Sequence, residues 1–141
     1  MDFPTLLVAL FSALKIPPLE EDGSGYCTFE VDGMPLTLHA PPEADTVAML
    51  APVGIADPED YVRLEELLVA NLGFKDEVRL AVDDNSNIVL MHWLPLAEID
   101  FPGFMIALED FLNYAEFWID RFNQPRVVAA PLPAAATSAL A

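Results

Sequence analysis

Asp83, Asn85 and Asn87 come closest, by residue type and spacing, to a site for chemistry. Oxygen-bearing side chains at every second position match the first three ligands of a calcium-binding loop. Such a loop needs glycine at its sixth position and glutamate at its twelfth, where this chain has Ile88 and Leu94. Because Asn and Asp also favour turns by bonding their own backbone, the sequence predicts a hairpin turn here and no metal ion.

The histidines and the cysteine give no metal site from local sequence. His39, His92 and the single cysteine, Cys27, are far apart in the chain, and none has a second ligand at zinc spacing. We expect structural roles for both histidines, with a spatial pairing between their two hairpins left open. A single cysteine also excludes an internal disulfide and fits a reducing compartment.

The chain carries no recognisable catalytic motif. None of its serines lies in a G-x-S-x-G setting, and there is no phosphate loop or dinucleotide fingerprint. The carboxylates are mostly on predicted solvent faces and loops, although a pair converging in a pocket stays open as an alternative. We therefore predict that the protein is not an enzyme and binds no cofactor.

Composition narrows the class of partner. The formal net charge is -17, with 6 basic and 23 acidic residues, and the basic residues are scattered singly. Binding to nucleic acid needs clustered Lys and Arg, so we expect no nucleic-acid partner.

The hydrophobic fraction of the chain is 54%, which predicts a folded chain rather than a disordered one. No run approaches 18 apolar residues, so we expect no membrane insertion, and the segment from Phe3 to Leu14 lacks the basic start of a signal peptide.

The periodicity of apolar residues along the chain predicts its helices and strands. Apolar residues at helical spacing predict a first helix over about residues 3–15, which is apolar nearly all round and should bury more than one face. Alternation of apolar and polar residues predicts one strand on each side of Asp32-Gly33, a dipeptide that is typical of a hairpin turn. It also predicts a third strand over residues 46–53. Asp57-Pro58 predicts the start of a second helix that Gly73 closes in the left-handed conformation.

Two strands over 78–82 and 88–94 and a helix over about 101–122 complete the pattern. Short turns between strands favour an antiparallel sheet, so we predict an α+β fold with helices packed on a twisted antiparallel sheet, in the order α-β-β-β-α-β-β-α. We assign one domain to residues 1–122 and a flexible, Pro- and Ala-rich tail to residues 123–141.

The apolar residues exceed what one packed face per helix requires. The second helix has two apolar stripes, which suggests two partners, the sheet and another subunit. Ile106 and Phe117 lie on the otherwise polar side of the last helix. Large exposed apolar patches usually mark interaction sites, so the sequence predicts a protein that binds polypeptides.

The sequence resembles the class I type III secretion chaperones, the Tir chaperone family, over about Phe3 to Phe122. The resemblance lies in the Leu6-Leu7 helix, the stretch from Tyr26 to Asp32, the helix end from Leu67 to Leu72, and the strand leading into Leu94-Pro95-Leu96. It implies a cytoplasmic bacterial homodimer that binds the N-terminal chaperone-binding segment of a secreted effector in extended, secretion-competent form. Strand addition and helix-in-groove contacts would hold such a client.

The resemblance also suggests two sets of residues. The candidates for contact with the effector are Leu7, Leu10, Phe11, Leu14 and Phe29. The candidates for the dimer interface are Tyr61, Val62, Leu68, Val69 and Leu72. The main alternative is an acidic α+β adaptor or regulatory protein that binds another peptide partner; an acidic mimic of nucleic acid is less consistent with the apolar excess.

Overall fold

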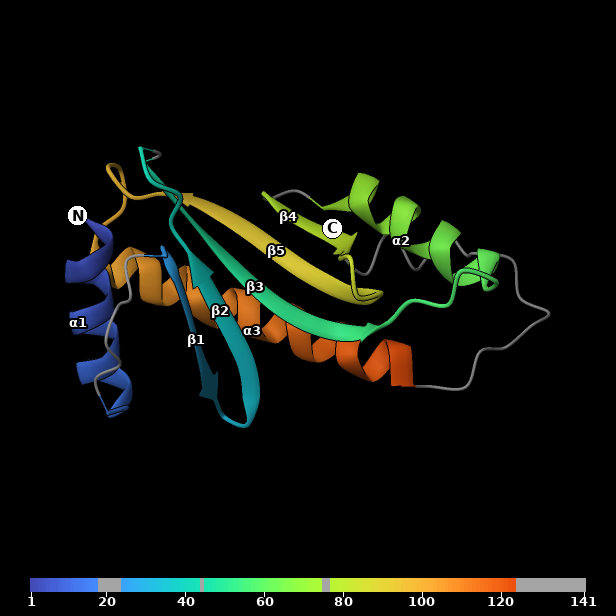
Figure 1. Ribbon diagram of the computed structural model, residues 1–141, viewed down its shortest axis with the longest axis horizontal. Helices are drawn as coiled ribbons and strands as arrows, with labels where there is room; N and C mark the ends of the chain where they lie inside the picture. The colour runs from blue at the N-terminus through green and yellow to red at the C-terminus, as the bar shows by residue number, and fades with distance from the viewer. Residues whose placement is uncertain (18–23, 44, 75–76, 124–141) are drawn as a thin grey trace.

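Five strands pair into one antiparallel sheet whose order in space is β1-β2-β3-β5-β4 (Figure 1). The computed structural model describes residues 1–17, 24–43, 45–74 and 77–123. The strands are β1 (Tyr26–Val31), β2 (Met34–His39), β3 (Thr46–Ile55), β4 (Val78–Val82) and β5 (Asn87–Pro95). The helices are α1 (Phe3–Leu14), α2 (Tyr61–Gly73) and α3 (Phe101–Asn123). The predicted fold class and element order are confirmed.

Turn chemistry explains the first hairpin. Asp32 and Gly33 have φ values of 51° and 79°, so both residues occupy the left-handed region that a two-residue hairpin turn of the mirror-image type requires. β1 and β2 then pair from Val31↔Met34 to Tyr26↔His39. The hairpin is therefore the one that Asp32-Gly33 predicted.

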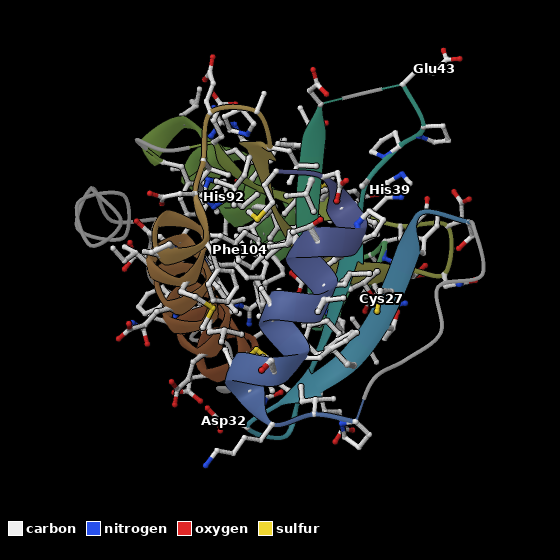
Figure 2. The ribbon with its side chains drawn as sticks, turned by 90° about the vertical axis from the view of Figure 1, so that its left-hand side faces the viewer. Cys27, Asp32, His39, Glu43, His92 and Phe104 are labelled. Atoms are coloured by element: carbon white, nitrogen blue, oxygen red, sulfur yellow. The ribbon has the colours of Figure 1, made fainter. Side chains whose placement is uncertain are left out.

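One face of the sheet, called the inner face here, carries the core. α1 and α3 both contribute to this core, and α1 lies at one end of the molecule, in front of α3 and the β1–β2 hairpin in the view of Figure 2. Alternate strand residues point inward and are fully or almost fully buried, among them Leu36, Leu38, Val47, Met49, Ile88 and Leu90. The last turn of α3 reaches β3 at Gly54, where an added Cβ would lie 3.1 Å from the Cβ of Phe122. A glycine at this position permits the close approach.

Capping side chains fix where the helices begin. Asp2 accepts a hydrogen bond from the backbone N–H of Thr5 at 2.8 Å, and Asp100 accepts one from Gly103 at 2.8 Å. The hydrogen bonds from Thr5 hold the pKa of the Asp2 carboxyl below its usual value. Lys15 closes α1 in the left-handed conformation, with φ of 56°.

Both predicted ends of α2 are wrong. Asp60, not Asp57, caps the helix by accepting a hydrogen bond from Arg63 N–H at 3.0 Å, and α2 begins at Tyr61. Asp57 instead accepts from Glu59 N–H within the preceding turn. The last helical residue is Gly73, and the capping residue Phe74 is extended, with φ of -70°, so no left-handed glycine closes this helix. Phe74, the residue that follows the helix, is buried against Tyr114 and Trp118 of α3.

Candidate polypeptide-binding surfaces

The acidic turn between β4 and β5 is a structural turn. The carboxylate of Asp83 accepts hydrogen bonds from the backbone N–H groups of Asn85 and Asn87, at 2.9 and 2.8 Å. Asn87 Nδ2 donates a third, at 3.1 Å. The bonds from Asn87 hold the pKa of the Asp83 carboxyl below its usual value. Across the described ranges, no three His, Cys, Asp or Glu side chains are grouped so that they could hold a metal ion.

The two histidines lie on opposite faces of the sheet (Figure 2). His92 pairs with Met49 in register and shares its inward direction, whereas His39 pairs with Ala48 and points outward. His39 stacks on Tyr26 with ring centroids 3.8 Å apart. Cys27 lies on β1, and the strands β2 and β3 separate it from His92 on β5. The structure therefore does not bring these three side chains together.

The five residues suggested for effector contact do lie together, but mostly inside the core. Leu7, Leu10, Phe11 and Phe29 are all buried, with at most 7% of their surface exposed, and Leu14 is half-buried. Phe11 and Phe29 meet edge to face, with centroids 5.4 Å apart. In this conformation Leu7, Leu10 and Phe11 face the protein's own core, and Phe29 of β1 faces α1. Their contact with an effector stays a prediction, and it would require α1 to move.

An open groove begins where this cluster ends. It lies between α3, the β1–β2 hairpin and Leu14, and it has a volume of about 740 Å³. Its α3 wall has an apolar and an acidic residue in alternation at spacings of three and four: Met105, Glu109, Leu112, Glu116 and Ile119. We call it the α3 groove. Sequence reasoning missed it, although the helical spacing of these five residues was visible, because only the fold places the hairpin beside them.

The five residues suggested for a dimer interface form one uncovered face of α2. At 100° per residue they fall within an arc of about 120°. Tyr61, Leu68 and Leu72 are 73%, 68% and 88% exposed, Val62 is exposed, and Val69 is half-buried. The opposite side of the helix, with Leu67 and Ala70, is buried. The division of α2 into its two predicted stripes is therefore wrong. The free face combines Tyr61, Leu68 and Leu72 of one stripe with Val62 and Val69 of the other, whereas Leu67 of the first stripe is packed.

Two polar contacts hold α2 in place, one to the edge strand β4 and one to α3. The backbone N–H of Leu80 donates to Asn71 Oδ1 at 2.7 Å, and Asn71 Nδ2 donates to the Leu80 carbonyl oxygen at 2.9 Å. The Asn71 amide therefore takes the place of a neighbouring strand. Glu66, 6% exposed, accepts hydrogen bonds from Arg63 at 3.3 Å and from Arg121 of α3 at 2.6 Å. Sequence reasoning found neither contact.

The comparisons with known proteins give the family. The chain matches the Tir chaperone protein (CesT) family over residues 5–119. It belongs to that family. The chain is therefore a type III secretion chaperone, of the kind whose partner is an effector polypeptide. No curated protein matches the sequence, and no described helix is both long and apolar enough to span a bilayer.

Solved structures similar to this chaperone share its fold at low sequence identity. The chain in the structure titled HopA1-SchA chaperone-effector complex has a TM-score of 0.67 and 18% identity over 83% of this chain and 92% of that chain. The ExsC-ExsE complex gives 0.69 and 20%, over 84% and 91%. YbjN from E. coli, described as a putative transcription regulator, gives 0.64 and 12%, over 84% and 90%. The fold alone therefore does not separate chaperones from regulators, whereas the family match does.

Proposed function

We propose that this chaperone acts as a homodimer that holds the N-terminal chaperone-binding segment of one secreted effector in extended form until export. Three of the most exposed apolar side chains, Tyr61, Leu68 and Leu72, lie on one face of α2, and this observation carries the proposal of a dimer. Burying such side chains against a second copy removes apolar area from water at about 25 cal/mol per Å². We place this function in the bacterial cytoplasm, where a client awaits export, and we assign it no catalytic step.

The two edges of the sheet are not equivalent as places for a client strand. At the β4 edge, both backbone groups of Leu80 are already bonded to Asn71. β1 lies at the other end of the sheet and pairs only with β2 among the described strands. An added strand needs unpaired backbone N–H and C=O groups, so the client strand pairs with β1 in this proposal.

Co-purification from the encoding bacterium tests the proposal. The tagged full-length chain should recover one secreted protein, and limited proteolysis of the complex should leave an N-terminal client fragment bound. The mass of the complex, from light scattering, should correspond to two copies of the chaperone. Recovery of the chain without any polypeptide, under conditions that induce secretion, would contradict the proposal.

A matched pair of variants on α1 locates the client. Leu14→Asp changes a half-buried residue that lines the α3 groove, whereas Val8→Asp changes a residue that is 72% exposed on the far side of the same helix. We expect Leu14→Asp to lower client recovery at least tenfold and Val8→Asp to leave it unchanged. Equal client recovery with both variants would show that the client does not contact this end of α1.

A further inference from the structure

The α3 groove has an acidic and apolar lining without a positive charge. Of the described residues that line it, Asp32, Glu109 and Glu116 are acidic and none is basic. Apolar side chains, including Met105, Leu112 and Ile119, lie between the carboxylates. A segment that fits this lining carries apolar side chains and a positive charge.

The chain itself contains a segment of that chemistry. Residues 124–141, which lie outside the described residues, contain no acidic residue, although the chain has 23. Their single charged side chain is Arg126, which Val127 and Val128 follow directly. In a protein with a net charge of -17, the side chains of this segment carry one positive charge and no negative charge.

Length and starting point allow this segment to reach the groove. It begins after Asn123, the last residue of α3, and Pro125 cannot continue the helix. From Asn123 back to Glu116 is about 10 Å along the helix axis at 1.5 Å per residue. From Asn123 forward to Arg126 is also about 10 Å in extended chain. A tail that turns back directly after Asn123 can therefore bring the long side chain of Arg126 within reach of Glu116, and Val127 and Val128 continue towards Leu112.

We propose that the C-terminal segment 124–141 folds back along α3 and occupies the α3 groove of its own chain, with Arg126 paired to Glu116. The segment is tethered, so its effective concentration at the groove is of millimolar order and weak contacts are sufficient for occupancy. A client segment that enters the groove must displace the tail. This last consequence rests on the proposed function, whereas the intramolecular contact does not.

Backbone amide chemical shifts of the full-length chain test the contact. The unoccupied reference is the full-length variant Val127→Asp with Val128→Asp, which cannot place these residues against an apolar wall. Relative to it, the wild-type chain should show shift changes centred on Leu112, Glu116 and Ile119, independent of protein concentration. Arg126→Glu and Glu116→Arg should each lower the occupancy constant about two- to fivefold, the range for an exposed charge pair.

A charge swap separates pairing from a general effect of charge. The double variant Glu116→Arg with Arg126→Glu should restore the wild-type shifts, and the control Asp84→Arg with Arg126→Glu should not, because Asp84 lies in the exposed turn after β4. Identical groove shifts in the wild-type and reference chains would overturn the proposal. Shifts that grow with concentration, or that centre on α2, would also overturn it by assigning the tail to another copy or another surface.

Client affinity reports on the consequence independently. If the tail fills the groove nine-tenths of the time, the apparent dissociation constant for a client segment rises tenfold. The reference variant should therefore bind the client about tenfold more tightly than the wild type. Groove shifts as expected, combined with a chain that binds no client, would uphold the tail contact and reject the proposed function.

Discussion

Single polar side chains do more than their local sequence suggests in this protein. Asn71 lies in a helix that sequence patterns describe only by its apolar stripes, yet its amide pairs with both backbone groups of Leu80, nine residues away. At a sheet edge this arrangement blocks the pairing of another strand. The residue thereby occupies the β4 edge of the sheet at Leu80.

Replacing Asn71 with Ala tests this role. The change leaves the Leu80 N–H and C=O groups without their partner, which costs about 1–3 kcal/mol where water does not replace it. We expect the urea midpoint to fall accordingly, with the m-value unchanged. Asn113→Ala, at an exposed position of α3, is the matched control and should shift stability by less than about 0.5 kcal/mol. Equal midpoints for the two variants would show that the amide contributes nothing at the edge.

At the scale of elements, a buried carboxylate couples α2 to α3. Glu66 contacts Arg121, 55 residues away, and Arg63, whose guanidinium lies 5.0 Å from the centroid of the Phe122 ring. Glu66→Gln keeps the shape of the side chain and removes its charge. Because Arg121 is 40% exposed, the loss should be about 1–3 kcal/mol, below the cost of breaking a fully buried pair.

Native-state hydrogen exchange can locate the part of the fold that loses stability when Glu66 is replaced. The Glu66→Gln variant should show faster exchange of amides in α2 and the last turns of α3, while β1 and β2 keep their protection. Glu65→Gln, the exposed neighbour, should leave all of these rates unchanged. Uniformly faster exchange would mean that Glu66 supports the whole fold rather than this junction.

The same elements show how far sequence reasoning reaches. Period-two alternation and Asp32-Gly33 predicted the first hairpin because both signals are local. The predicted start of α2 was wrong because Asp57 and Asp60 are both acceptable caps by residue type, and the structure shows Asp60 in that role while Asp57 caps the preceding turn. Apolar periodicity placed Leu10 and Phe11 on one face of a helix, but it cannot distinguish packing against the protein's own core from contact with a client. The contacts of Asn71 and Glu66 have no sequence signal, since their partners become neighbours only after folding.

Across the whole molecule, the burial of an apolar residue decides whether a charged substitution there tests folding or tests binding. Leu10 is fully buried, so Leu10→Asp should unfold the chain and cannot test client contact. Leu68, at 68% exposed, offers the cleaner experiment: Leu68→Glu should leave the fold intact and raise the dimer dissociation constant at least tenfold, equal to about 1.4 kcal/mol. Light scattering over a dilution series measures this change, and circular dichroism checks the fold. Val8→Glu, equally exposed but on α1, should not affect the dimer. A monomeric wild-type chain, or a Leu68→Glu variant that dimerises as well as the wild type, would show that α2 does not form a dimer interface.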